Sequence, residues 1–146
     1  MARVCPVDQG SQLSFEFREY PSGAQKGAID PSHKGPCAVY MKSISSAINS
    51  NPIGNGWFKI WDEGYDTMSK QWCTEKLIQD NGYLSVLVPQ GLKGGYYLVR
   101  TELLSLHEAN RKPPKPQFYV GCAQVFLNTN ATGVVKSTVS IPGMWT

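Results

Sequence analysis

The sequence lacks the patterns that mark several common classes of protein. No apolar segment approaches the length of a membrane span, and the beginning of the chain has no apolar signal core. It contains no nucleophile elbow, phosphate-binding loop, His-Glu-x-x-His motif or dinucleotide fingerprint. Fourteen basic and eleven acidic residues give a net charge of only +3 without a long basic block. Neither nucleic acid nor a membrane is therefore expected as a partner.

Cysteine is scarce but even in number. The four cysteines form no CxxC pair and lie far in sequence from the two histidines, which argues against a zinc site. An even count fits two disulfides and an oxidising compartment, although four cysteines allow three pairings. A glycosylation sequon begins at Asn130 in a polar stretch. Together these features favour a secreted, disulfide-bonded glycoprotein.

The chain of 146 residues is long enough for one domain spanning residues 1–146. It contains no repeat or domain linker, and turn-rich segments such as 20–34 and 43–55 separate short strands. One short helix is predicted at 73–80, closed by Asn81-Gly82. Strands are predicted at 12–17, 37–41, 56–61, 83–88, 96–106, 117–127 and 134–141. This pattern predicts an antiparallel β-sandwich, with both ends of the chain resembling cut ends that leave sheet edges exposed.

Gln117 and Tyr119 form an unusual polar pair on one predicted strand. Positions two apart on a strand point the same way, about 7 Å from each other. Cys122 falls on the opposite face with Phe118 and Val120, a phase that suits a core disulfide while the polar pair faces outward. Gln117 could simply satisfy backbone groups, and Tyr119 could be an ordinary half-buried aromatic. The alternative is a small polar site.

His33 and His107 are the candidates to complete such a site. His33 lies in a turn that leads into the strand beginning at Cys37, where an imidazole is exposed enough to bind copper or zinc. His107 follows a long strand and is in phase with Ser105. It could donate a proton near a bound oxygen species. For each histidine taken alone, a solvated loop or strand-end residue is the favoured interpretation.

Four segments in order resemble one protein family. The chain is similar to the fungal lytic polysaccharide monooxygenases of auxiliary activity family nine, formerly glycoside hydrolase family 61, from about Cys5 to Gly143. The segments are Ser32-His33-Lys34-Gly35-Pro36, Gly56-Trp57-Phe58-Lys59-Ile60, Gly95-Tyr96-Tyr97-Leu98-Val99-Arg100 leading to Leu106-His107, and Gln117-Phe118-Tyr119-Val120-Gly121-Cys122-Ala123-Gln124. Four motifs in the same order are far more specific than any one of them.

The resemblance implies a secreted, monomeric enzyme with an immunoglobulin-like β-sandwich and one type 2 copper ion on a flat surface. In this family copper is held by a "histidine brace", the amine and imidazole of a first-residue histidine plus a second histidine. Reduced copper uses O₂ or H₂O₂, with an external electron donor, to cleave β-1,4-glucan chains of cellulose. By motif, His33 matches the second brace histidine and Tyr119 the axial tyrosine. His107 and Gln117 match the pair that hydrogen-bonds the activated oxygen.

The same resemblance makes two predictions about the cysteines and raises one departure. Cys5 and Cys122 match the family's core disulfide, which leaves Cys37 and Cys73 to pair with each other. The chain begins with Met1 and has no N-terminal histidine. We therefore expect an N-terminally truncated monooxygenase that binds copper weakly and is inactive by itself. The alternative is a non-catalytic, polysaccharide-binding relative with a degenerate copper site.

Overall fold

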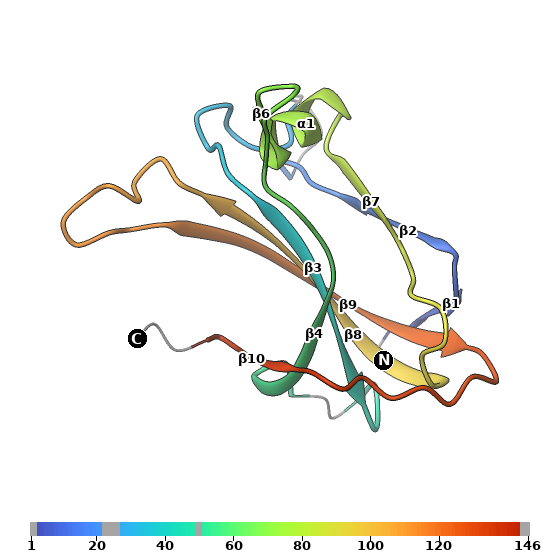
Figure 1. Ribbon diagram of the computed structural model, residues 1–146. Helices are drawn as coiled ribbons and strands as arrows, with labels where there is room; N and C mark the ends of the chain where they lie inside the picture. Colours follow the sequence, from blue (N-terminus) through green and yellow to red (C-terminus); the bar gives the residue numbers. More distant parts are fainter. Residues whose placement is uncertain (1–2, 22–26, 49–50, 144–146) are drawn as a thin grey trace.

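The computed structural model describes residues 3–21, 27–48 and 51–143, and within them most regular structure is β-strand (Figure 1). A six-stranded sheet has the order β1-β9-β8-β3-β4-β10, a two-stranded sheet pairs β2 with β7, and β5 and β6 form a small hairpin. Figure 1 shows the β2–β7 pair facing the larger sheet, with α1 at one end of the space between them. The strands are β1 (Cys5–Asp8), β2 (Gln12–Glu16), β3 (Cys37–Ile44), β4 (Gly54–Glu63), β5 (Tyr65–Asp66), β6 (Gln71–Trp72), β7 (Tyr83–Leu87), β8 (Gly95–Ser105), β9 (Gln117–Asn128) and β10 (Val139–Ile141).

The core lies between the two sheets because alternate side chains of each strand point into the space between them. On β3 every second residue from Cys37 to Met41 is buried, and on β8 every second residue from Val99 to Ser105 is buried. Leu13, Phe15 and Phe17 pack against this core from the opposite layer, as their predicted common face requires. A smaller cluster of Trp57, Leu98 and Ile141 lies apart from this core. Alternation therefore separates the two faces of each strand, and the packing of the layers decides which face is buried.

Most predicted strands are confirmed, with shifted ends. The segment 134–141 forms a strand only at 139–141, and the predicted loop 43–55 contains the end of β3 and the start of β4. β1, β5 and β6 were not predicted, since two- to four-residue strands show no measurable alternation. The sandwich is also not wholly antiparallel, because β1 pairs with β9 in parallel. Parts of the predicted loops 20–34 and 43–55, and both chain ends, lie outside the described residues.

The predicted helix is confirmed as α1 (Cys73–Gln79). At its start the backbone N–H of Trp72 donates to the Glu75 carboxylate at 3.0 Å. It ends where Asn81 and Gly82 adopt positive φ angles of 54° and 83°, a backbone conformation that glycine and asparagine tolerate. In the described part of the chain, no helix is both long enough and apolar enough to cross a membrane.

One of the two predicted disulfides is confirmed. Cys37 at the start of β3 bonds to Cys73 at the start of α1, with the Cα atoms 5.8 Å apart. Both cysteines are buried, at 2% and 3% exposure. The bond fastens the helix to the central part of the larger sheet.

The disulfide between Cys5 and Cys122 is contradicted. Both cysteines are free and exposed. The parallel register places Cys5 beside Val125, three residues along β9 from Cys122. Three residues separate the two positions by about 10 Å along the strand and turn their side chains to opposite faces, whereas disulfides need Cα atoms within about 7 Å.

The predicted orientation of β9 is also wrong. Phe118 and Val120 are 43% and 48% exposed, and Cys122 is exposed with them. Tyr119 instead packs against the core from a half-buried position. The sequence gives the phase of the strand correctly, but an exposed apolar face cannot be told from a buried one by alternation alone.

A groove of about 910 Å³ lies between β2 and β9, with residues 17–19, residues 28–30 and His33 along its walls. Residues 125–128 of β9 pair with β1 on their outer side, but among the described strands none pairs with Val120–Ala123 on that side. We call Val120–Ala123 the open edge of β9. All four residues are exposed, while Val125 and Leu127 in the covered half are buried.

Candidate metal centre

His33 is brought to the end of β8 by backbone hydrogen bonds of the segment that follows it. The Leu106 N–H donates to the Lys34 carbonyl at 3.0 Å, and the Leu104 N–H donates to the Pro36 carbonyl at 2.9 Å. The first of these bonds continues the β3–β8 pairing beyond the ends of both strands, and the second continues it beyond the start of β3. They explain why a histidine before β3 and a histidine after β8 come together.

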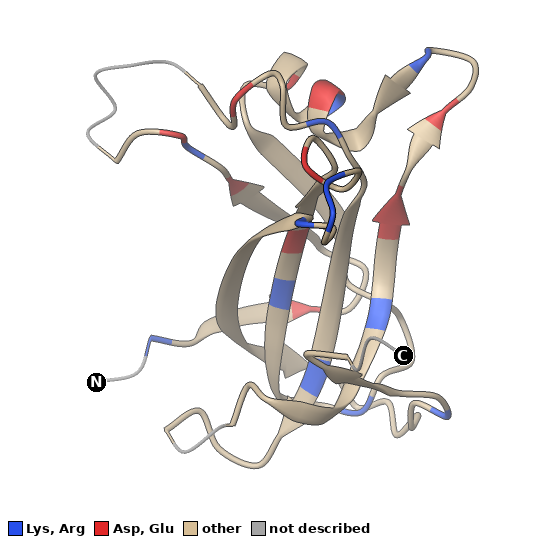
Figure 2. Ribbon diagram, turned by 90° about the vertical axis from the view of Figure 1, so that its left-hand side faces the viewer, with Lys and Arg blue, Asp and Glu red and all other residues tan. Residues whose placement is uncertain are grey.

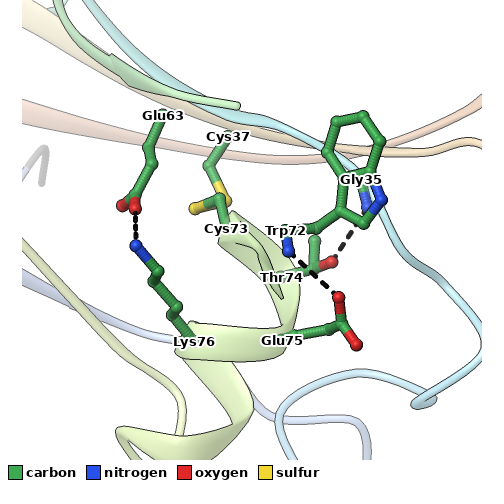
Figure 3. Close-up of a disulfide and its surroundings, with 8 residues drawn as sticks. All are labelled: Gly35, Cys37, Glu63, Trp72, Cys73, Thr74, Glu75 and Lys76. Carbon is green, nitrogen blue, oxygen red and sulfur yellow. Dashed lines mark hydrogen bonds and ion pairs between the residues drawn. A yellow bond between two sulfur atoms is a disulfide. The ribbon is translucent and has the colours of Figure 1, made fainter. Parts of the chain in front are cut away.

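Helix α1 fixes the same segment from the other side (Figure 3). The Gly35 N–H donates to the buried Thr74 hydroxyl at 3.0 Å, and the Thr74 N–H donates to the Gly35 carbonyl at 3.3 Å. Lys34 pairs with Glu75 at 2.8 Å. A Cβ at position 35 would lie 1.7 Å from the Leu104 carbonyl oxygen, so only glycine fits. We call these contacts, together with the Cys37–Cys73 bond, the α1 clamp.

His107 lies against His33. The two imidazole rings stack with centroids 4.2 Å apart and an interplanar angle of 21°. The Nδ1 atom of His107 lies 2.6 Å from the hydroxyl of Ser105, the last residue of β8. The predicted phase of His107 with Ser105 is therefore confirmed as a direct contact.

Gln117 and Tyr119 are the first and third residues of β9 and lie beside the histidines. The Tyr119 hydroxyl donates to Gln117 Oε1 at 2.9 Å and lies 3.0 Å from His33 Nδ1. The Tyr119 ring stacks on His33 with centroids 5.5 Å apart. All four residues predicted to form a polar site are thus in one connected group, contributed by three separate segments.

Asp30 adds a negative charge next to this group. Hydrogen bonds from Ser32, including one of 2.8 Å from its backbone N–H, hold the pKa of Asp30 below its ordinary value. Burial, and to a smaller extent the Asp30 carboxylate, raises the pKa of the Tyr119 phenol. At neutral pH Asp30 is therefore charged and Tyr119 is a neutral phenol. Sequence reasoning missed Asp30, whose only signal was its position three residues before His33.

These side chains can provide ligands for a metal that favours imidazole nitrogen. A phenol has one hydrogen, which Tyr119 gives to Gln117, so His33 donates its Nδ1–H to the Tyr119 oxygen. In the neutral imidazole this leaves Nε2 of His33 with a lone pair free for a metal. Imidazole suits copper, and a weak axial oxygen is compatible with it. Within the described residues no group of three or more His, Cys, Asp or Glu side chains gathers around a metal position.

Asn130, the predicted glycosylation residue, lies just beyond β9 and is exposed. Its modification stays a prediction.

Comparisons with known proteins identify the family of this chain. The family model described as Auxiliary Activity family 9 (formerly GH61) matches residues 1–146. "AA9 family lytic polysaccharide monooxygenase H" of Botryotinia fuckeliana is 63% identical over 141 residues, which are 97% of this chain and 32% of that protein. The D protein of the same name from Malbranchea cinnamomea is 36% identical, over 99% of this chain and 59% of its own length.

Solved structures show the same fold. The structure named CvAA9A superposes with a TM-score of 0.80 and 31% identity, over 91% of this chain and 60% of that one. HiLPMO9B gives a TM-score of 0.75 and 26% identity, over 98% of this chain and 60% of its own. These likenesses confirm the predicted immunoglobulin-like β-sandwich. The chain spans between a quarter and three fifths of the lengths of the curated relatives it matches. Its sequence, its fold and its site residues all lead to one conclusion: the chain belongs to Auxiliary Activity family 9.

Proposed function

We propose that this chain carries part of the copper site of a secreted lytic polysaccharide monooxygenase that cleaves β-1,4-glucan chains of cellulose. Membership of the family supports oxidative attack on a polysaccharide. The observation that carries the proposal is the convergence of His33, His107, Gln117 and Tyr119, with His33 and Tyr119 in contact at 3.0 Å. A core histidine or a lone surface histidine would not need this polar group around it.

His33 would hold copper through Nε2, and Tyr119 would hold the ring in place from the Nδ1 side. Bound copper supplies one-electron chemistry with an external donor and with O₂ or H₂O₂. Tyr119 receives the Nδ1–H of His33 and so fixes the orientation of that ring. The raised pKa of Tyr119 keeps its proton in place, so that a neutral phenol oxygen accepts the His33 hydrogen.

Gln117 and His107 would orient the oxygen substrate. The amide oxygen of Gln117 is occupied by the Tyr119 hydroxyl, which leaves its NH₂ group as the donor that remains for a ligand. His107 stacks on His33, which would bring its own donor close to the same ligand. Donors fixed in advance where negative charge develops lower the barrier of such reactions.

The same donor set supports a second candidate function. His33 and His107 are the only histidines of the sequence, and no third strong ligand accompanies them in the described structure. We expect weak copper binding and no activity from this chain alone. A polysaccharide-binding relative that does not oxidise its ligand would show the same sparse set.

Secretion and glycosylation at Asn130 belong to the proposal, as does a monomeric state. The buried Cys37–Cys73 bond supports passage through an oxidising compartment. The exposed sequon residue supports access for glycosylation.

Copper binding tests the assigned ligands. Titration with Cu²⁺, followed by calorimetry and electron paramagnetic resonance, should show one weak site that His33→Ala abolishes. Tyr119→Phe should change the copper spectrum, whereas the matched control Tyr83→Phe on the exposed part of β7 should not. An unchanged spectrum for Tyr119→Phe would count against a role for Tyr119 at the copper site.

Cellulose assays separate the two candidate functions. The natural secreted protein is incubated with cellulose, a reductant and copper, with and without a chelator, and soluble products are examined by mass spectrometry. Binding without oxidised oligosaccharides supports the non-catalytic candidate. Chelator-sensitive oxidised products reject that candidate. N-terminal sequencing of the natural secreted protein then tests the proposed brace, because a first residue other than histidine would exclude it.

A further inference from the structure

Ser105 is a fully buried serine with one side-chain partner. It is the last residue of β8, pairs with Gln117 across the β8–β9 ladder, and has 0% exposure. No buried side-chain nitrogen or oxygen in the described structure lacks a hydrogen-bond partner. The partner of the Ser105 hydroxyl is His107 Nδ1 at 2.6 Å. A hydroxyl buried in this way needs an acceptor for its hydrogen, because water cannot supply one.

This contact determines which nitrogen of His107 carries the proton. A neutral imidazole has one N–H donor and one bare acceptor nitrogen. Since the Ser105 hydrogen has Nδ1 as its acceptor, Nδ1 of His107 must be the bare nitrogen. Neutral His107 therefore carries its proton on Nε2, the nitrogen farther from the serine.

His33 has the opposite arrangement. Its Nδ1 donates to the Tyr119 oxygen, because the Tyr119 hydrogen is given to Gln117. Its Nε2 is consequently bare. Two imidazoles whose centroids are only 4.2 Å apart thus differ in protonation, one with a free lone pair and one with a free N–H.

We infer that Ser105 is a positioning residue that selects the Nε2–H tautomer of His107 and holds its ring against His33. This inference rests on the proposed function for its purpose, though not for its geometry. The tautomer gives the two histidines separate tasks: His33 offers a lone pair to a metal, and His107 offers a hydrogen-bond donor to the oxygen substrate. If both rings had a bare outer nitrogen, they would compete for the metal instead.

The purely structural alternative is that Ser105 only fills space at the end of β8. Alanine would then serve equally well, and the protonation of His107 would be indifferent to residue 105. The two readings differ in a spectroscopic property of one ring, which can be measured directly.

The test is nitrogen-15 NMR of the full chain labelled at histidine, without metal. The sequence contains only two histidines, so four ring nitrogens are observed, and His107→Gln assigns them. Spectra are recorded near pH 8.5, well above the ordinary imidazole pKa of about 6.5. We expect His107 protonated at Nε2 and His33 protonated at Nδ1. Observation of a His107 protonated at Nδ1 would overturn the inference.

Variants of Ser105 test the cause. Ser105→Ala should move the His107 Nδ1 and Nε2 signals toward each other as the two tautomers mix, while thermal melting confirms that the variant is folded. Ser105→Thr keeps the hydroxyl and should restore the wild-type pattern. Ser85→Ala removes a serine hydroxyl from β7 and should leave both rings unchanged. Unaltered His107 signals in Ser105→Ala would reject the role of Ser105.

This experiment separates the inference from the proposed function. The tautomers are measured in the absence of copper, so a failure to bind copper would contradict the proposed function and leave the Ser105 result standing. A contrary tautomer would remove the inference and leave copper binding through His33 possible.

Discussion

The end of the sandwich around α1 and the open edge of β9 differ in how far their cysteines, charged side chains and apolar side chains are bonded or buried. Around α1, Cys37 and Cys73 are bonded and buried. Lys76 contacts Glu63 at 2.5 Å and Asp66 at 3.0 Å. Figure 2 shows acidic and basic positions interspersed around the β5–β6 hairpin and along the strands of the larger sheet. This end is closed by covalent, ionic and apolar contacts together.

At the open edge of β9, by contrast, a cysteine and an apolar side chain are exposed to solvent. Cys122 is a free exposed thiol, and Val120 is 48% exposed. The edge residues Val120–Ala123 have no outer partner strand among the described ones. A strand edge of this kind is a template for pairing with another chain.

The candidate metal centre lies on the border between these regions. His33 is held by the α1 clamp, through Gly35 and Thr74, whereas Tyr119 is the residue next to the open edge. The comparison shows that the contacts of the α1 clamp hold the segment after His33, whereas Tyr119 is positioned by strand β9. Changes in the closed region should therefore cost stability, and changes at the open edge should alter association.

The largest effect is expected from the two cysteine pairs. Replacing Cys37 and Cys73 together by serine should lower the free energy of unfolding by about 4 kcal/mol, because the bond closes a loop of 36 residues. Replacing Cys5 and Cys122 together should change it by less than about 0.5 kcal/mol, since both are exposed and free. Urea unfolding measures both. Equal losses would show that the two pairs are equivalent.

The α1 clamp is tested next at its glycine. Gly35→Ala should destabilise by about 3 kcal/mol, because the new Cβ meets the Leu104 carbonyl and forces the segment away from β8. Gly64→Ala is the matched control, with no atom within 4 Å of its new Cβ. Thermal unfolding compares the two variants. A neutral Gly35→Ala would mean that the His33 segment is not held as described.

Association is the property expected to change at the open edge. Val120→Lys should reduce aggregation at high protein concentration, measured by light scattering, since a charge on an exposed strand opposes edge pairing. Its free energy of unfolding should stay within about 0.5 kcal/mol of wild type. Val125→Lys, at a position 3% exposed in the covered half of β9, should instead unfold the protein. Similar behaviour of the two variants would abolish the distinction between the halves of β9.

The smallest effect concerns acid stability around α1. Hydrogen bonds from Lys76, then from Ser69 and Met68, hold the pKa of Asp66 well below its ordinary value. A carboxyl whose pKa is lowered by folding contributes stability above its unfolded value of about 3.9, and this contribution is lost as the pH falls further. The melting temperatures of wild type and Asp66→Asn should therefore differ at neutral pH and converge below about pH 4.

Asp62→Asn provides the control for this acid effect. Asp62 lies 3.6 Å from Lys59 and is 61% exposed. An exposed ion pair of this kind contributes little to stability, so the melting temperature of this variant should match that of wild type at every pH. A difference in melting temperature between wild type and Asp66→Asn that stays constant at all pH values would contradict the assigned contacts of Asp66.

The sequence predicted most strands because their periodicity is a local property. It identified β2, β3, β4, β7, β8 and β9 and the single helix of the described chain, and it named Cys37 with Cys73 through the family resemblance. It missed β1, which has four residues and depends on its parallel partner β9. The Cys5–Cys122 bond was wrong for the same reason, since register between distant strands is not written in either strand alone.

The candidate site shows the same division. The sequence by itself determined that Gln117 and Tyr119 share a face and that His107 is in phase with Ser105, because strand geometry repeats every two residues. The identity of the four polar residues followed from motif order. Only the tertiary structure decided that the histidines stack, that α1 holds the segment after His33, and that β9 turns its polar pair inward. Those outcomes depend on which distant segments pack together, and the free energy of packing is a property of the whole fold.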